Sequence, residues 1–134
     1  MKYHYIILLF LLLMSCNVQK NIISQNSEII RAQVYKIYLK DSIIIYHIKN
    51  KNMYGVFAKQ RYCKNKVKNQ KLLRENKVYK FFLQQEAIDT SVSFGRDVDY
   101  YMGGYLIRKA GTPTIYYWDC LNVCGEYIIK EHKH

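Results

Sequence analysis

The sequence predicts an all-β fold, a small antiparallel barrel of five or six strands with at most one short helical turn. Between residues 29 and 134, no stretch of ten or more residues repeats its apolar positions with the period of a helix. Short segments rich in β-branched and aromatic residues are instead separated by polar turns, a pattern typical of strands. So few strands must protect their edges, and therefore a closed or nearly closed barrel is favoured over a flat sheet.

The first three strands are expected over residues 31–39, 43–49 and 53–59. The first alternates roughly between apolar and polar residues, and the second begins apolar on both faces, as a central strand does. Polar tripeptides at residues 40–42 and 50–52 are turn signals. Because these connections are so short, the three strands must form an antiparallel meander.

The second half of the chain has a less regular pattern. Residues 59–71 lose the apolar alternation and gather charge, so a long exposed loop is expected there. A fourth strand follows over residues 77–84, and the weakly patterned residues 86–99 are expected to connect it to the next one. A glycine pair interrupts the strand expected over residues 100–108, and residues 115–118 favour a further strand or the start of a helix.

The single helical turn is expected near the end of the chain. Asp119 can cap a turn that runs through Cys124, and Gly125 can end it in the left-handed conformation. Residues 126–130 are expected to form the last strand. A three-strand meander, a long excursion and later strands occur in an order similar to that of OB-fold domains, a resemblance that implies a partly open barrel.

Composition limits the class of protein. The chain has 134 residues, of which 50% are hydrophobic, which is enough for one folded domain and too apolar for a disordered chain. Twenty-one Lys and Arg against ten Asp and Glu give a net charge of +11, which favours an anionic partner. An A/T-rich genome would also enrich Lys and Tyr, so the fourteen tyrosines do not by themselves indicate binding.

The N-terminus has the features of an export signal. Lys2 is followed by an uncharged apolar run over residues 6–14, which is too short to cross about 30 Å of hydrocarbon as a helix. A short positive start followed by a short apolar run is typical of a secretory signal peptide. Residues 1–15 are therefore expected to be removed.

The residues at the expected cleavage site resemble a known motif. Leu13-Met14-Ser15-Cys16 resembles the lipobox of bacterial lipoproteins, and the chain as a whole is similar to small uncharacterised lipoproteins of Gram-negative bacteria. The resemblance implies that Cys16 is lipidated and anchors the protein in a membrane of the cell envelope, facing the periplasm. Residues 16–28 would then be a lipidated tether, and residues 29–134 a single β domain. A secreted protein with a chance cysteine, or an uncleaved N-terminal anchor, remains an alternative.

Three cysteines remain in the expected mature domain: Cys63, Cys120 and Cys124. An exported protein meets an oxidising compartment, so one disulfide and one leftover thiol are expected. A bridge from Cys63 to Cys120 or Cys124 is the preferred pairing, because it closes a loop of about sixty residues. Cys120 and Cys124 with His132 and His134 could suggest zinc, but the spacing is not that of a finger and no metal is expected.

A basic segment is the strongest candidate for a binding surface. The polyanion-facing residues expected are Lys59, Arg61, Lys64, Lys66, Lys68 and Lys71. Outside the cytoplasm the anionic partners are lipid headgroups and acidic glycans rather than nucleic acid, and another envelope protein is a further possible partner. A solvated lysine-rich loop that only keeps the domain soluble is the alternative.

Catalysis finds less support in the sequence. Neither a phosphate-binding glycine motif nor a nucleophile elbow occurs, so no cofactor or catalytic residue is expected. The sequence therefore favours a non-catalytic binding or interaction module. A small envelope enzyme that uses Asp97 and Asp99, or a free cysteine thiol, is the alternative.

Overall fold

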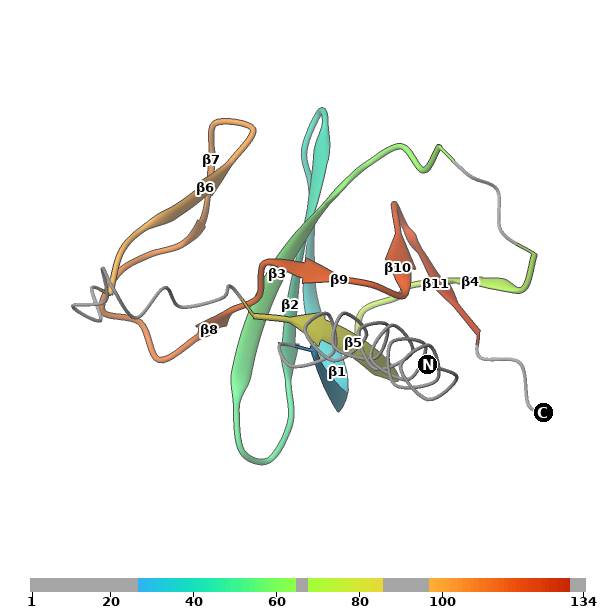
Figure 1. Ribbon diagram of the computed structural model, residues 1–134, viewed down its shortest axis with the longest axis horizontal. Helices are drawn as coiled ribbons and strands as arrows, with labels where there is room; N and C mark the ends of the chain where they lie inside the picture. The colour runs from blue at the N-terminus through green and yellow to red at the C-terminus, as the bar shows by residue number, and fades with distance from the viewer. Residues whose placement is uncertain (1–26, 65–67, 86–96, 131–134) are drawn as a thin grey trace, which may run out of the picture.

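The computed structural model describes residues 27–64, 68–85 and 97–130, and these residues form strands and turns without a helix (Figure 1). The strands are β1 (Ser27–Leu39), β2 (Ile43–Lys49), β3 (Tyr54–Gln60), β4 (Gln70–Leu72), β5 (Lys77–Gln84), β6 (Tyr100–Met102), β7 (Tyr105–Arg108), β8 (Ile115–Tyr116), β9 (Asp119–Cys120), β10 (Val123–Cys124) and β11 (Tyr127–Ile129). The expected all-β fold is confirmed. Nothing in the described part of the chain is a helix that could cross a membrane.

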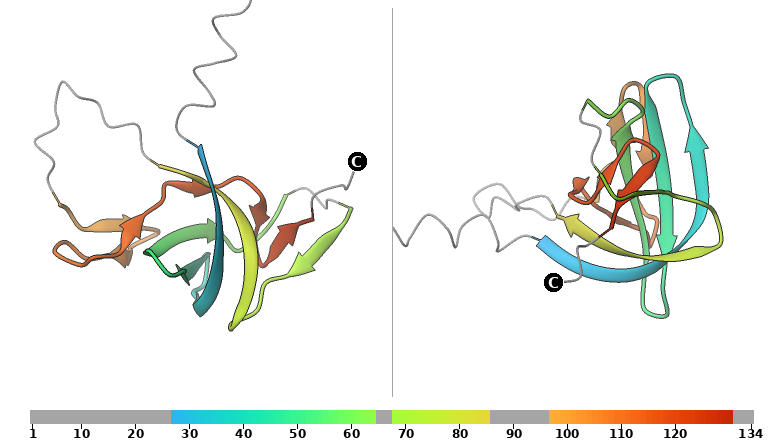
Figure 2. Two further views of the ribbon diagram at one scale, coloured as in Figure 1. Left: turned by 90° about the horizontal axis from the view of Figure 1, so that it is seen from below. Right: turned by 90° about the vertical axis from the view of Figure 1, so that its right-hand side faces the viewer.

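A curled six-stranded sheet, in the order β8-β3-β2-β1-β5-β9, dominates the molecule. Strands β1, β2 and β3 form the expected antiparallel meander. The long strand β1 pairs with β5 through its first half and with β2 through its second half. A bulge in β1 between Val34 and Lys36 shifts its pairing with β2. Bulges increase local bending and twist, and the side views show β1 curving around the sheet (Figure 2).

The segment from β8 to β9 joins the two edges of this sheet. Strand β8 pairs with β3, and the next amide, of Tyr117, donates to Val56 O at 2.9 Å. The amide of Trp118 then donates to Gln84 O at 2.8 Å, and β9 continues antiparallel to β5. A meander, a long excursion and a return between β3 and β5 give the order expected of an OB-like barrel. The pairing of β8 with β3 is parallel, although only antiparallel neighbours were expected.

Two hydrophobic clusters lie on opposite faces of the meander. Inward residues of the curled sheet form the larger one, in which Tyr46, Phe57 and Phe81 are almost completely buried and pack ring against ring. The smaller cluster lies outside β2 and β3, where Ile45 and Val56 pack beneath Ile107 of β7. The hairpin formed by β6 and β7 therefore covers the outer face of β2 and β3.

The expected helical turn is wrong. Asp119 and Cys120 form β9, and Val123 and Cys124 form β10, which pairs with β11. The amide of Leu121 donates to Phe82 O at 2.8 Å, so this segment makes its hydrogen bonds to β5 rather than within itself. Gly125 does have a positive φ of 58°, but it lies in the turn between β10 and β11.

Several strand limits also differ from expectation. Strand β1 begins at Ser27, because its first residues pair with the end of β5. The segment expected as an exposed loop at residues 59–71 enters β4, which pairs with β11. The interrupted strand at residues 100–108 is a hairpin whose turn contains Gly103 and Gly104, both with positive φ.

Candidate binding cleft and basic surface

A cleft of about 510 Å³ lies where three parts of the chain meet. Its walls come from the end of β3 and residues 62–64, from Tyr101 and Met102 of β6, and from the segment between β8 and Gly125. This volume falls within the roughly 300–1,000 Å³ typical of small-molecule sites. The fold therefore forms a site of ligand size from segments that are more than fifty residues apart in sequence.

Aromatic side chains line the cleft. Tyr62, Tyr101 and Trp118 line it and are 76%, 62% and 60% exposed. Tyr116, which is half-buried, also lines it and stacks on Tyr100 with ring centroids 4.0 Å apart. Three largely exposed aromatic rings thus lie around one cavity, close to a ring that is already held by stacking.

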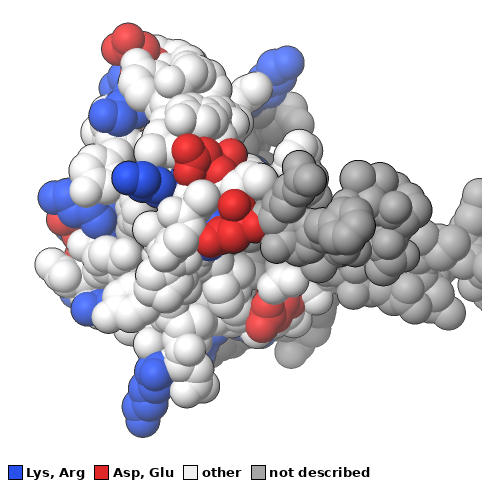
Figure 3. Space-filling view, turned by 90° about the vertical axis from the view of Figure 1, so that its left-hand side faces the viewer, with Lys and Arg blue, Asp and Glu red and all other residues white. Residues whose placement is uncertain are grey.

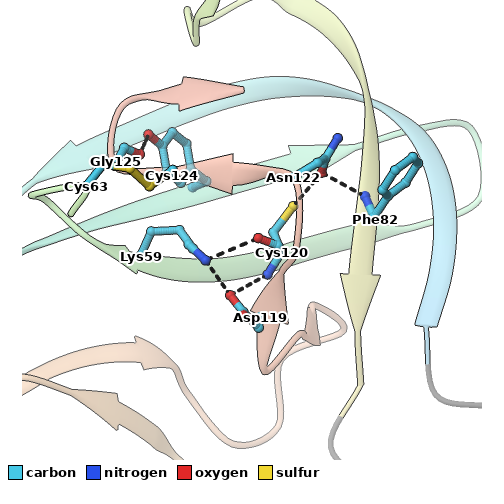
Figure 4. Close-up of polar contacts among 9 residues, drawn as sticks. Lys59, Cys63, Phe82, Asp119, Cys120, Asn122, Cys124 and Gly125 are labelled. Carbon is cyan, nitrogen blue, oxygen red and sulfur yellow. Dashed lines mark hydrogen bonds and ion pairs between the residues drawn. A yellow bond between two sulfur atoms is a disulfide. The ribbon is translucent and has the colours of Figure 1, made fainter. Parts of the chain in front are cut away.

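The cleft also contains a charged pair that the fold holds in place. Lys59 Nζ lies 2.6 Å from Asp119 Oδ1 and donates to Cys120 O at 3.2 Å (Figure 4). The same carboxylate oxygen of Asp119 accepts from the amide of Cys120 at 2.8 Å. The Lys59 side chain is only 18% exposed, so this lysine joins β3 to β9 and is not positioned to face a polyanion.

The remaining thiol lies beneath this pair. Cys120 is fully buried, its Sγ donates to Asn122 Oδ1 at 3.2 Å, and burial raises the pKa of the thiol to about 12. A protonated and inaccessible thiol is a poor nucleophile. Cys120 therefore lacks the properties that the alternative of a thiol enzyme requires.

A disulfide joins Cys63 to Cys124, which is one of the two pairings preferred from the sequence. It holds the cleft wall that contains Cys63 against β10. Beside it, a Cβ added to Gly125 would lie 2.7 Å from Arg61 O, so only glycine permits this close approach. Tyr46 donates its hydroxyl to Gly125 O at 2.7 Å from inside the barrel. Covalent, steric and hydrogen-bonding constraints therefore hold the same wall.

Four residues of the expected basic set are exposed: Arg61, Lys64, Lys68 and Lys71. We call these four the basic surface. None of them has an acidic side chain within ion-pair distance among the described residues. Glu75, the one acidic residue nearby in sequence, instead accepts from the amide of Ile37 and pairs with Lys36. Lys66 lies outside the described residues.

Charge is distributed differently on the side of the molecule that carries β6, β7 and β8. Acidic and basic side chains are interspersed over that face (Figure 3). Asp97 there pairs with Arg108 and accepts from the amide of Gly111, and Asp99 accepts from the amide of Ala110 at 2.6 Å. The hydrogen bond from Arg108, followed by that from Gly111, lowers the pKa of Asp97.

These contacts give the two aspartates a structural role. They connect the chain entering β6 to the turn after β7, and both side chains are exposed. A carboxylate with a lowered pKa is poorly suited to donate a proton at neutral pH. The geometry therefore indicates that Asp97 and Asp99 stabilise the β6–β7 hairpin rather than form an acid–base pair.

Other residues considered from the sequence lie partly outside the described ranges. Cys124 is oxidised, so it cannot join Cys120 as a thiolate ligand, and His132 and His134 lie outside the described residues. Within the ranges that the structure describes, no three ligating side chains gather at one point. The lipidation residue expected, Cys16, also lies outside these ranges.

Sequence reasoning missed the aromatic side of the cleft. In the sequence, Tyr62 lies among basic residues, and Tyr101 and Trp118 lie in segments that are expected to be strands. Only their position in the chain could have indicated two of these residues. Tyr101 precedes the Gly103-Gly104 turn, and Trp118 follows the end of β8. Comparison of the chain with family models, with curated proteins and with solved structures gave no match.

Proposed function

We propose that the protein is a non-catalytic binding module of the bacterial cell envelope, anchored by a lipid on Cys16 and facing the periplasm, whose basic surface contacts an anionic envelope component. One observation carries the proposal. Arg61, Lys64, Lys68 and Lys71 are exposed and have no acidic partner among the described residues. The nearest acidic residue in sequence, Glu75, is held by β1.

The size of the effect follows from general electrostatics. Each positive charge close to an anionic surface contributes about 1 kcal/mol, and the attraction fades over a Debye length of about 10 Å at 0.1 M salt. Four such charges on one segment make binding strong at low salt and weak at high salt. In the envelope the polyanions that fit this chemistry are phosphate-bearing lipid headgroups and acidic glycans.

The anchor is tested by metabolic labelling with a radioactive or clickable fatty acid. Native protein should carry the label and pellet with membranes, and the Cys16→Ala variant should carry none. Label that persists in the variant, or a native protein without acyl mass on Cys16, would overturn the lipoprotein proposal.

The basic surface is tested with the full chain, purified in a non-ionic detergent and applied to immobilised polygalacturonate. The triple variant R61Q/K68Q/K71Q should elute at markedly lower salt than the native protein. The matched control R31Q/K51Q/K109Q removes the same charge from exposed positions elsewhere and should elute close to native.

Two competitors distinguish the sources of negative charge. Soluble polygalacturonate should release the protein if acidic glycans are preferred, and mixed micelles containing phosphatidylglycerol should release it if lipid headgroups are preferred. Equal elution of the two triple variants would show that net charge alone explains retention, and the proposed surface would be wrong.

A further inference from the structure

We propose that the cleft lined by Tyr62, Tyr101 and Trp118 binds an acidic oligosaccharide, with sugar rings lying on these aromatic side chains. This inference rests on the binding function proposed above and names its ligand class and its site. The juxtaposition of exposed aromatic rings, fixed polar groups and excess positive charge around one cavity carries it.

The aromatic rings are the first argument. A single exposed aromatic residue on a protein surface needs no explanation, whereas apolar side chains gathered at one place indicate a contact surface. Tyr62, Tyr101 and Trp118 are each more than half exposed and come from three separate elements. Tyr and Trp are also the side chains that combine a flat apolar face with a polar group. The C–H face of a pyranose ring is a flat apolar surface of matching size.

Fixed polar groups supply the second argument. Asp119 lines the cleft, and its side chain is 36% exposed even while it pairs with Lys59. Gln60, also exposed, lines the same cavity. Carboxylate, amide and ammonium groups together donate to and accept from hydroxyls. A ligand with apolar faces and hydroxylated edges satisfies both sets of groups, whereas a purely apolar ligand would leave the polar groups without water or partners.

The shape of the site favours more than one sugar ring. A second cavity of about 340 Å³ adjoins the first and shares Gln60, Tyr62 and Met102 with it. It extends toward Ser42 and Gly103, in the turns before β2 and after β6. Tyr62 therefore stands between two hollows, so a linear oligosaccharide can place rings on both sides of it.

The positive charge at the cleft favours acidic oligosaccharides over neutral ones. Asp119 is neutralised by Lys59, so the uncompensated charge among the lining residues comes from Lys64, and Arg61, directly after the end of β3, precedes the lining residue Tyr62. A carboxylate or sulfate on the sugar would meet these cations, and charge-assisted hydrogen bonds of this kind are stronger than those between neutral groups.

Trp118 makes the proposal directly measurable, because it is the single tryptophan of the chain. The full chain in non-ionic detergent is titrated with tri-galacturonic acid and with tetrasaccharides of hyaluronan and heparin, while Trp118 emission is recorded. At least one acidic oligosaccharide should change the emission saturably, and maltotriose should bind at least about fivefold more weakly. Tyr101→Ala should weaken the binding at least tenfold, and Lys64→Gln about fivefold.

A matched variant and a stability measurement exclude trivial causes. Tyr54→Ala removes an exposed tyrosine that does not line the cleft and should leave the titration unchanged. The urea midpoint of each variant shows whether it is folded. Absence of a saturable response to all three acidic probes, equal binding of maltotriose, or unchanged binding by folded Tyr101→Ala would overturn the inference.

The two proposals fail separately. One outcome is that the chain is retained on polygalacturonate through the basic surface while Trp118 emission changes with none of the probes. In that case only the cleft inference is wrong. If Trp118 emission responds saturably but the two triple-charge variants elute alike, the proposal for the basic surface is wrong and the cleft inference is supported.

Discussion

Removing the Cys63–Cys124 disulfide should lower the free energy of unfolding by about 4 kcal/mol. The two cysteines are 61 residues apart in sequence, and the chain-entropy model assigns about 4 kcal/mol to a closed loop of this length, because the crosslink restricts the unfolded chain. For a domain of this size that loss corresponds to a fall in Tm of roughly 20 °C. The double variant C63A/C124A is the perturbation.

The folded state of the variant should change little. The amide of Arg61 still donates to Ser42 O at 2.9 Å, and Tyr46 still donates to Gly125 O, so both ends of the cleft wall keep a hydrogen bond. The loss of stability should therefore come mainly from the greater freedom of the unfolded chain. A larger dependence of unfolding free energy on urea concentration should accompany it, since the reduced unfolded chain exposes more surface.

Urea unfolding followed by circular dichroism measures both quantities. A reducing agent should bring the native protein to the stability of C63A/C124A and should leave the variant unchanged. A loss below about 1 kcal/mol would refute the reasoning, because it would mean that the crosslink does not restrict the unfolded chain as the loop length requires.

Two further predictions concern residues beside the cleft. Asn122 accepts from the amide of Phe82 at 3.0 Å and donates to Lys80 O at 2.8 Å, so Asn122→Ala should cost about 2–4 kcal/mol in urea unfolding, against about 0.5 kcal/mol for the exposed neighbour in Leu121→Ala. Cys120 has its thiol pKa raised from 9.0 to about 12, so iodoacetamide at pH 8 should modify it at least about 1,000-fold more slowly than an ordinary thiol, measured by mass spectrometry. Raising the pH toward 12 should speed the reaction, and rapid labelling of folded protein at pH 8 would contradict the buried position.

The predicted strands that proved accurate are those with strong local patterns. Strand β2 (Ile43–Lys49) and strand β5 (Lys77–Gln84) have the limits expected from the sequence. Both consist of apolar, β-branched or aromatic residues between polar turns, and burial of one or both faces enforces that pattern. The meander follows from the shortness of the two connections.

The error at residues 119–124 has a physical cause. Asp119 and Gly125 have the local chemistry of helix caps, and a cap prediction weighs only neighbours in sequence. The hydrogen bonds that decide this segment run from Trp118 and Leu121 to β5, more than thirty residues earlier. Those partners are invisible in a local pattern, so tertiary pairing overrides the cap signal.

The candidate site also combines features that the local sequence indicates with features that only tertiary contacts decide. Sequence composition indicated a basic segment, and the pairing of Cys63 with one of two later cysteines followed from counting. Whether Lys59 is free or bound depends on Asp119, sixty residues away, and the structure holds the two together. The cleft itself arises only when β3, β6 and β9 converge.

The sequence by itself determined the β class of the domain, the meander and the excess of positive charge, because alternation, turn residues and composition are local or additive properties. The tertiary structure alone decided that β8 and β9 join the two edges of the sheet, that Cys124 rather than Cys120 is oxidised, and that three aromatic rings share one cavity. Each of these depends on contacts between residues far apart in the chain, and only the curling of the sheet into a barrel-like shape brings those residues together.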